Sequence, residues 1–316
     1  MYYDKLCDLG IKLVRRSGTV KTKCPQCSDG RKNKTDNPLS VNINEGEYCC
    51  HNCGWKGNVR SFERKRDNKK YEKPPQDILK NIELKEKATS WFNKRGISKA
   101  TLDKFMIFTK EEYMPQTEKK ENCICFPYFR DGEIVNIKYR DAVKNFKLSK
   151  GAELIFYNLN AIGDKKSIVI VEGEIDCLSV YEAGFGQLYD KIPLETDSDG
   201  VVTKEENNPL GEIIPISVPN GASKGNQKLD YLDNCADWFV GLHDIIIATD
   251  DDEAGLLLKD ELIRRLGVER CKVISYPIEE IVPLETGFKR RCKDLNEVLM
   301  YLGKDVVKNV INNAQS

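Results

Sequence analysis

The chain has 316 residues, which is about two domains at the usual size of roughly 150 residues each. With 40% hydrophobic and 32% charged residues, it can bury a core and remain soluble. Its longest apolar runs, such as residues 167–171, fall far short of the ~20 residues of a membrane span, and the N-terminus lacks the apolar stretch of a secretory signal. We therefore expect no membrane anchor and a cytoplasmic location.

Fifty basic and fifty acidic residues give a net charge of zero, which taken alone argues against a nucleic-acid-binding protein. The charge is nevertheless distributed unevenly. Residues 1–75 hold 17 basic and 9 acidic residues, a net charge of +8, so the rest of the chain has a net charge of −8. A basic module of this kind suits a polyanionic partner, although an ordinary solvated surface explains it equally well.

Two Cys-x2-Cys pairs occur in this basic module, separated by 22 residues. Each pair can present two thiolates to one ion, and two pairs complete a tetrahedral zinc site. Cys49 could replace its neighbour in the second pair, but the spacing argues against it. Residues 39–43 alternate as a strand does, so we predict a small β zinc ribbon over residues 1–60 with one structural Zn²⁺. The predicted ligands are Cys24, Cys27, Cys50 and Cys53.

Basic and aromatic side chains decorate the predicted ribbon. Such a mixture suits a single nucleic-acid strand, because the cations neutralise phosphates and the rings stack on bases. The alternative is a zinc ribbon with a purely structural role, in which the metal stabilises a module too small to supply its own core. Residues 61–76 are highly charged and contain a double proline, as expected of a mobile linker. The predicted nucleic-acid-binding residues are Arg31, Lys32, Lys34, His51, Trp55 and Lys56.

The next segment, residues 77–165, is predicted to form a mixed α+β subdomain. Apolar residues recur at helical spacing from 77 to 95. Residues 123–129 and 133–140 have the character of strands, and Asp131–Gly132 between them predicts a hairpin.

The second of these strands leads into an unusually basic stretch. An exposed edge strand often has lysines that prevent aggregation. A wall that binds phosphate groups explains the stretch equally well. The basic residues are Lys138, Arg140, Lys144, Lys147 and Lys150.

Residues 166–316 are predicted to form an α/β domain with a parallel sheet covered by helices on both faces. Apolar runs at 167–171, 243–249 and 272–277 alternate with helical patterns, which is typical of β-α-β connections. Ligands of such sheets bind beyond the carboxyl ends of the strands.

Carboxylates follow two of these strands directly. Glu172 follows the first strand, and Asp250 and Asp252 follow the second. Residues i and i+2 of an extended segment project to the same side, so the two aspartates can share an ion, and Mg²⁺ is the cation that carboxylates and phosphates bind together. Acidic residues also cap helix N-termini, which would explain either cluster alone. The equivalent positions of the two clusters favour a metal site.

Other catalytic classes lack the residues they need. The histidines of the chain are His51 and His243, and the first lies in the predicted ribbon, so a Ser-His-Asp or Cys-His mechanism is not expected. No G-x4-G-K-[ST] motif occurs, which argues against an ATPase motor of the P-loop kind.

A strand that ends in Glu-Gly-x-x-Asp at 172–176, followed by one that ends in Asp-x-Asp at 250–252, resembles a TOPRIM domain. With the four-cysteine ribbon, the chain resembles the primase half of phage primase–helicase proteins. The segments KYRDAVKNFK, VEGEIDCLSV, NGASKGNQK, ATDDDEAG and KDLNE resemble motifs of that family in its order. The resemblance covers about residues 20–300, and it implies a ribbon, a mixed α+β subdomain and a TOPRIM domain.

The resemblance also implies a reaction assisted by two divalent metal ions, Mg²⁺ or Mn²⁺, which bridge the phosphates of the incoming nucleotide. The implied metal ligands are Glu172, Asp250, Asp252 and Asp294. A general base is the alternative role for Glu172. The residues implied to neutralise the triphosphate or template backbone are Lys138, Arg140 and Lys147. Further phosphate contacts are expected from Lys144 and Lys224.

The implied function is that of a DNA primase, which makes short RNA primers on single-stranded DNA from ribonucleoside triphosphates during phage replication in the host cytoplasm. Two alternatives use similar residues: a TOPRIM nuclease, and a non-catalytic recombination mediator that binds DNA. The helicase half of the family is absent from the chain, so a separate replicative helicase is the expected partner. Residues 191–210 look like an extra loop or hairpin to which we assign no role.

Overall fold

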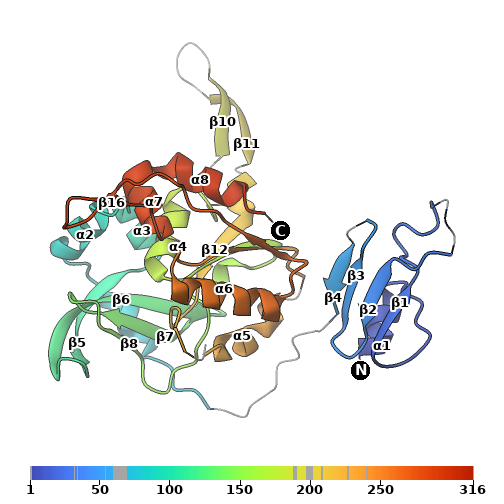
Figure 1. The fold of residues 1–316 in the computed structure, drawn as a ribbon. Coiled ribbons are helices and arrows are strands. Elements are labelled where there is room, and N and C mark those ends of the chain that lie inside the picture. Colours follow the sequence, from blue (N-terminus) through green and yellow to red (C-terminus); the bar gives the residue numbers. More distant parts are fainter. Residues whose placement is uncertain are drawn as a thin grey trace. The chain divides into compact units, whose positions relative to one another are not determined.

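The computed structural model describes residues 2–31, 33, 35–53, 55–59, 70–187, 191–196, 202–207, 209–225, 228–239 and 241–315. The chain forms two compact units, the first mainly residues 1–62 and the second mainly residues 63–262 and 272–315 (Figure 1). Residues 61–69 of the predicted linker lie outside the described residues, as do Lys32, Lys34 and the side chain of Lys56. None of the helices in the described part of the chain is both long enough and apolar enough to cross a membrane.

The first unit is a small sheet with one helix. Helix α1 (Tyr2–Asp8) precedes an antiparallel sheet of β1 (Thr19–Thr22), β2 (Leu39–Asn42), β3 (Glu47–Cys50) and β4 (Lys56–Asn58), in that order. Strand β2 confirms the strand predicted at 39–43. Its alternate residues Leu39 and Val41 are fully buried and belong with Leu6 of α1 to one small core. A core of this size needs a further cross-link for stability.

The second unit begins with three short helices, so the continuous helix predicted over residues 77–95 is wrong. The helices are the 3-10 helix η1 (Gln76–Asn81), α2 (Glu86–Asn93) and α3 (Lys99–Lys104). The backbone is extended at Ile82. The next carbonyl oxygen, that of Glu83, accepts hydrogen bonds from the amide and the hydroxyl of Thr109 at 2.8 and 2.9 Å. These tertiary hydrogen bonds outweigh the local helical pattern.

An antiparallel sheet follows, with the order β5 (Phe108–Met114), β6 (Lys119–Arg130), β7 (Glu133–Arg140) and β8 (Phe146–Leu148). Strands β6 and β7 confirm the predicted hairpin. Both residues of its turn have positive φ, 52° for Asp131 and 81° for Gly132, which suits a tight two-residue hairpin. Strand β7 lies inside the sheet, and its residues Lys138 and Arg140 are buried. The edge-strand explanation for these two basic residues is therefore wrong.

The second sheet of this unit has the strand order β12–β9–β13–β14. Its strands are β9 (Ser167–Val171), β12 (Ile213–Ser217), β13 (Asp244–Ala248) and β14 (Cys271–Val273). Strand β9 runs parallel to both of its neighbours, which confirms the predicted parallel sheet. Strand β12 is absent from the prediction, because Pro215 at its centre disfavours strand pairing. Strand β14 is shorter than the run predicted at 272–277.

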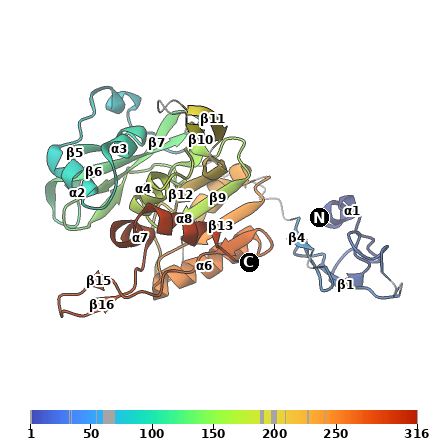
Figure 2. The same ribbon diagram turned by 90° about the horizontal axis from the view of Figure 1, so that it is seen from above.

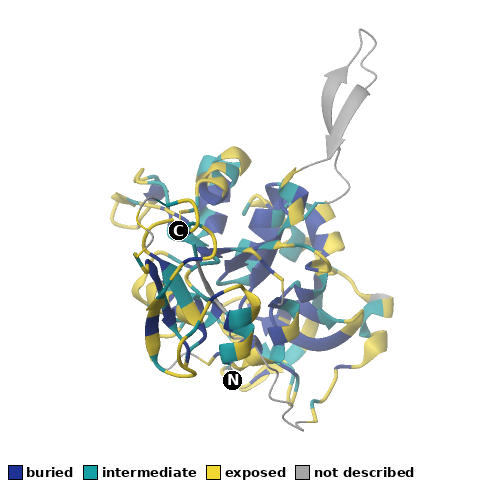
Figure 3. Ribbon diagram, turned by 90° about the vertical axis from the view of Figure 1, so that its right-hand side faces the viewer, coloured by how far each residue is buried: buried dark blue, intermediate teal, exposed yellow. Residues whose placement is uncertain are grey.

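Helices cover both faces of the parallel sheet (Figure 2). One face bears α4 (Glu174–Glu182), α7 (Leu295–Leu302) and α8 (Lys304–Asn312), and the other bears α5 (Asp230–Asn234) and α6 (Glu253–Leu266). Figure 3 shows that the strands between them are largely buried. This arrangement confirms the α/β fold predicted for the C-terminal part of the chain.

Shorter elements complete the second unit. Three are the 3-10 helices η2 (Leu159–Ala161), η3 (Pro209–Glu212) and η4 (Ala236–Phe239). Within residues 191–210, β10 (Lys191–Thr196) pairs with β11 (Val202–Asn207), which confirms a hairpin. The expected tip of this hairpin, Asp199–Gly200, lies outside the described residues. A further hairpin is made by β15 (Val282–Pro283) and β16 (Lys289–Arg290).

Candidate active site and metal centre

Four cysteine sulfurs converge in the first unit. The Sγ atoms of Cys24, Cys27, Cys50 and Cys53 lie within 4.8 Å of one another, with Cys24–Cys53 at 3.8 Å and Cys27–Cys50 at 3.7 Å. A tetrahedron with Zn–S bonds of about 2.3 Å has edges of about 3.8 Å. The neighbouring Cys49 is not part of this group. The geometry therefore fits one structural Zn²⁺ with four thiolate ligands.

Three predicted nucleic-acid-binding residues have described side chains, namely Arg31, His51 and Trp55, and Trp55 is half-buried against the core of the first unit. The rings of Tyr48 and Trp55 pack with their centroids 4.5 Å apart, and His51 is exposed. Arg31 forms a 2.7 Å ion pair with Asp36, which reduces the charge that it offers to a phosphate. The contact of these residues with nucleic acid stays a prediction.

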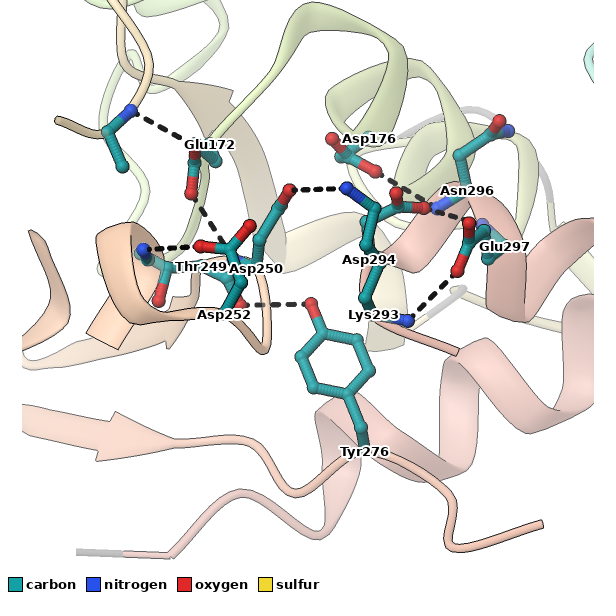
Figure 4. A network of polar contacts seen from close by, with 12 residues as sticks. Glu172, Asp176, Thr249, Asp250, Asp252, Tyr276, Lys293, Asp294, Asn296 and Glu297 are labelled. Carbon is teal, nitrogen blue, oxygen red and sulfur yellow. Dashed lines mark hydrogen bonds and ion pairs between the residues drawn. The ribbon is translucent and has the colours of Figure 1, made fainter. Parts of the chain in front are cut away.

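In the second unit, carboxylates gather at the carboxyl ends of β9 and β13 (Figure 4). The last residues of these strands, Val171 and Ala248, are paired in register, so the chain leaves both strands at the same edge of the sheet. Glu172 Oε2 accepts the backbone amide of Asp250 at 3.4 Å, and Glu172 Oε1 accepts that of Ala222 at 3.0 Å. Glu172 is thus fixed between the neighbouring strand end and the loop that follows β12.

Two helices add further carboxylates beside Asp250 (Figure 4). Asp176 lies in the first turn of α4, and its Oδ1 accepts the amide of Asn296 at 3.0 Å. Asp294 is the N-cap of α7, and its Oδ1 accepts the amide of Glu297 at 2.7 Å. Asp176 is missing from the predicted site residues. Its position in the first helical turn after a strand, where side chains reach the crevice, is the signal that could have identified it.

Burial and mutual repulsion make these carboxyl groups difficult to ionise. Burial and the charges of Glu172 and Asp294 raise the pKa of Asp250 to about 8. Burial also raises the pKa of Glu172, and burial together with Asp294 and Asp250 raises the pKa of Asp176 well above its usual value. Lys293 is a partial counter-ion, with its Nζ 4.0 Å from Asp250 Oδ2. When ionised, the cluster would hold more negative charge than this lysine neutralises, and a bound divalent cation would relieve the excess.

Asp252 has a different environment from the other carboxylates. Its Oδ1 accepts the amide of Gly255 at 3.0 Å, so it caps the start of α6, and it is exposed. A Cβ atom at position 255 would lie 2.1 Å from the carbonyl oxygen of Asp250, which explains the glycine. Among the described residues, the four cysteines are the one group with three or more ligand atoms within 4.8 Å of one another. The carboxylates are therefore spread around the crevice and do not converge on one point.

Basic residues from the antiparallel sheet line the same cleft as the carboxylates, and the cleft has a volume of about 450 Å³. The loop after β12 also contributes to its wall through Asn220 and Gly221. The predicted site residues that line it are Lys138, Arg140, Lys147, Glu172 and Asp250. Residues separated by more than a hundred positions in the sequence thus line one space.

Lys138 is held in this cleft by a buried acid. Its Nζ lies 2.9 and 3.0 Å from the two carboxylate oxygens of Glu174, and the hydroxyl of Tyr128 donates to Glu174 Oε1. All three side chains are buried, so the ammonium group is fixed in position and shielded from water. The sequence prediction omits Glu174 and Tyr128, because nothing in the sequence shows that β7 packs against α4.

Arg140 and Lys147 are constrained by other contacts. The guanidinium carbon of Arg140 lies 4.6 Å from the ring centre of Trp91, and that of Arg95 lies 4.3 Å from the same ring. Lys147 Nζ lies 2.7 Å from Glu112 Oε1, outside the carboxylate cluster. Lys147 therefore shares its charge with an acid, while Arg140 is held by an aromatic ring that leaves its charge available to a ligand.

Lys144 and Lys224 do not line this cleft. Lys144 is an exposed residue of the turn between β7 and β8, with φ 67°. Lys224 forms an exposed ion pair of 2.6 Å with Glu253 at the start of α6. Their contacts with phosphate stay predictions.

Comparison with known proteins gives two relatives that align with most of the chain. A protein named Primase homolog protein from Arabidopsis thaliana is 30% identical over 304 residues, which are 92% of this chain and 80% of the relative. The Twinkle homolog protein, chloroplastic/mitochondrial, of the same plant is 30% identical over 305 residues, 92% of this chain but 38% of the relative. No protein-family model matches the chain.

Two solved structures have similar arrangements of the chain. The primase fragment of the bacteriophage T7 primase-helicase protein aligns with 92% of this chain and 97% of its own, with a TM-score of 0.48 and 22% identity. The zinc-binding and RNA polymerase domains of the Aquifex aeolicus primase align with 99% of this chain and 83% of their own, with a TM-score of 0.48 and 14% identity.

Proposed function

This chain belongs to the primase family that includes the Primase homolog protein of Arabidopsis thaliana, and we propose that it synthesises short RNA primers on single-stranded DNA from ribonucleoside triphosphates. The observation that supports this function most directly is the single cleft in which carboxylates and buried basic residues meet. Joining two free nucleotides requires metal ligands and triphosphate-binding cations in the same place. Either set of residues alone would be insufficient.

Four acidic residues, two of which line the cleft, are the proposed ligands of two Mg²⁺ or Mn²⁺ ions. When bound, these ions would stabilise the charge of the transferring nucleotidyl group and activate the attacking 3′-hydroxyl group. Carboxylate oxygens are the ligands that such ions prefer, and burial together with the charges of Glu172 and Asp294 raises the pKa of Asp250. The proposed ligands are Glu172, Asp250, Asp252 and Asp294.

The basic residues of the cleft are proposed to bind the triphosphate. Arg140 can form paired hydrogen bonds with phosphate oxygens. Lys138 is positioned by Glu174, at 2.9 Å, so it acts as a fixed hydrogen-bond donor with part of its charge already neutralised. Lys147 becomes fully available when its contact with Glu112 opens.

The zinc ribbon is proposed to bind the template and to deliver it to the cleft. Trp55 and His51 are the described residues that can stack on bases, and Arg31 can contact a phosphate if it leaves Asp36. A separate replicative helicase is the proposed partner for strand separation, and the sequence contains no P-loop motif.

One assay distinguishes primer synthesis from the alternatives. The protein is incubated with labelled ribonucleotides, Mg²⁺ and a panel of single-stranded DNA templates, and the products are separated on a denaturing gel. Short RNA products that depend on template support the proposal. Shortened template strands would indicate a nuclease instead, and DNA binding without any product would indicate a non-catalytic mediator.

Divalent cations should stabilise the protein more strongly at high pH. The pKa of Asp250 is about 8 in the folded chain and near 4 in the unfolded chain. As the pH rises, the unfolded chain therefore releases this proton at a lower pH than the folded chain does. Without metal, the contribution of this group to stability therefore falls as pH rises from about 4 to about 8. Saturating Mg²⁺ should raise the melting temperature by about 5 °C at high pH and less at low pH, measured by calorimetry.

The matched variant is Asp250→Asn, which removes the titrating group with little change in shape. Its melting temperature without metal at high pH should exceed that of the wild type, and its response to Mg²⁺ should be weaker. Equal responses of the two proteins to Mg²⁺ would show that Asp250 does not contact the ion.

Lys147→Ala should weaken the use of nucleotides without changing the zinc content. Removing one charge-assisted contact of roughly 1.5 kcal/mol predicts a rise of about tenfold in the KM for ribonucleotides, measured by steady-state primer synthesis. Lys110→Ala is the control, because Lys110 approaches the same Glu112 at 3.8 Å but does not line the cleft. Equal kinetics of the two variants would remove Lys147 from the nucleotide site.

A further inference from the structure

Residues 278–291 form an arm that projects from the second unit beside α7 (Figure 2). Its two strands pair through Val282 with Arg290 and through Pro283 with Lys289. The tip is closed by a hydrogen bond of 2.8 Å from the amide of Leu284 to the carbonyl oxygen of Phe288. Gly287 at the tip has φ +86°, which a residue with a side chain rarely adopts. The arm is thus an ordered hairpin with a defined tip.

The base of the arm is fixed to the helix that bears the candidate active-site residue Asp294. Both terminal nitrogens of Arg290 lie close to the carboxylate of Glu297 on α7, at 2.8 and 2.6 Å. Val282 and Cys292 on either side are buried. The paired hydrogen bonds hold Arg290 in one orientation, so the arm has a set position relative to the active site.

The outer part of the arm exposes an aromatic ring beside cations. Phe288 is 75% exposed. Lys289 and Arg291 on the same strand segment are exposed, and neither forms an ion pair or side-chain hydrogen bond within the described part of the chain. An exposed ring close in the sequence to unpaired cations suits a single nucleic-acid strand, which can stack a base on the ring and have its phosphates neutralised by the cations.

The remaining residues of the arm argue against docking of a protein through an apolar patch. Leu284 and Ile278 are also exposed, at 41% and 72%. Three acidic residues, Glu279, Glu280 and Glu285, interrupt this apolar surface in the sequence. Interfaces between proteins prefer continuous apolar patches, whereas the aromatic residue of the arm is followed in the sequence by cations.

The arm is also within reach of a strand that occupies the active site. Phe288 and Asp294 are six positions apart in the chain, so their Cα atoms are at most roughly 20 Å apart. This distance corresponds to about six nucleotides at a rise of 3.4 Å each. The tip of the arm is therefore within the length of a short template held at the carboxylate cluster.

We propose that residues 278–291 form a second contact for single-stranded DNA, in which Phe288 stacks on a base and Lys289 and Arg291 neutralise phosphates. This contact rests on the proposed primase function for its biological purpose. Its chemistry, however, can be tested by binding alone. The arm would hold the template close to the active site after the zinc ribbon has delivered it.

The test is a titration of labelled single-stranded DNA with the whole protein, followed by fluorescence anisotropy at several salt concentrations. Phe288→Ala should weaken binding by about 5- to 100-fold, the range for loss of one stacked base. The double variant Lys289→Ala/Arg291→Ala should reduce the slope of log K against log salt by about 1.4, since each phosphate contact to a single strand contributes about 0.7. Leu284→Ala, in the same hairpin, is the control and should bind as the wild type does.

Unchanged affinity and unchanged salt slope in the Phe288 and double variants, at wild-type melting temperatures, would overturn the proposal. Equal weakening by Leu284→Ala and Phe288→Ala would also overturn it, because that result indicates a general apolar contact and not stacking. The gel assay separates this outcome from failure of the primase function. If the wild type makes RNA while the arm variants bind DNA normally, the arm proposal alone fails. If the variants lose DNA affinity while the wild type makes no RNA, the primase proposal alone fails.

Discussion

Primer synthesis by the Glu172→Gln variant is expected to fall by at least about 100-fold, because a metal ion and its ligands supply several kcal/mol of transition-state stabilisation. The substitution removes the charge of Glu172 and keeps its length. The amides of Ala222 and Asp250 donate to different oxygens of Glu172, at 3.0 and 3.4 Å, and a glutamine keeps only one carbonyl oxygen as an acceptor. This oxygen should take the shorter contact, with Ala222, so the loop after β12 should stay in place and the loss should mainly concern the chemistry. The measurement is the amount of labelled RNA on a denaturing gel.

Asp251→Asn is the matched control for this loss. Asp251 stands between two proposed metal ligands in the sequence and is exposed, and its backbone amide donates to the carbonyl oxygen of Lys293 at 2.7 Å. The substitution retains that backbone contact, so activity should stay within about twofold of the wild type, as is usual for exposed positions. Wild-type activity in Glu172→Gln would exclude Glu172 from the reaction. A loss of the same size in Asp251→Asn would instead show a general requirement for negative charge at this edge of the sheet.

Cys27→Ser is expected to abolish zinc binding and template-directed synthesis together. A four-cysteine site contributes roughly 10–16 kcal/mol of apparent binding energy, most of which the small ribbon core cannot replace. The ribbon should therefore unfold. The second unit has its own sheets and helices, so its melting transition should persist. Metal analysis gives the zinc content, calorimetry follows the two units, and the gel assay with and without template gives the activity.

Cys49→Ser provides the control, since Cys49 neighbours a ligand but lies outside the group of converging sulfurs. It should keep its zinc and its template-directed activity. If Cys27→Ser loses zinc but primes on its template as well as the wild type does, the ribbon has a purely structural role and takes no part in template binding. If Cys49→Ser loses zinc instead, the ligand assignment from the Cys-x2-Cys spacing is incorrect.

Local spacing in the sequence was sufficient for the features that depend on neighbouring residues. The Cys-x2-Cys pairs predict the sulfur cluster because two such turns can each direct two thiolates to one point. The Asp131–Gly132 step predicts the β6–β7 hairpin, because few other residues adopt its backbone angles. The helix expected over residues 77–95 is interrupted where the carbonyl oxygen of Glu83 accepts a hydrogen bond from the hydroxyl of Thr109, 26 residues away. Strand β12 was not predicted, because Pro215 at its centre is atypical of a paired strand.

Charge partners were the hardest feature to predict. The basic stretch around Lys138 and Arg140 had two equally good explanations in the sequence, and strand order excluded one of them, an exposed edge strand, by placing β7 inside its sheet. Glu174, the acid that holds Lys138 at 2.9 Å, lies 36 residues away on a helix of the other layer. No periodic pattern in the sequence indicates this ion pair, because the two side chains meet only when the two layers pack together.

The neutral average charge of the chain thus conceals a basic N-terminal part and an acidic remainder, and the sequence alone determined this division, the zinc ligands and the two strand ends with carboxylates. It could do so because each of these features is set by residues close together in the chain. Tertiary structure alone decided that Lys138, Arg140 and Lys147 share a cleft with Glu172 and Asp250. It also raised the pKa of Asp250 to about 8, since burial and repulsion between carboxylates depend on distances through space that the order of residues does not contain.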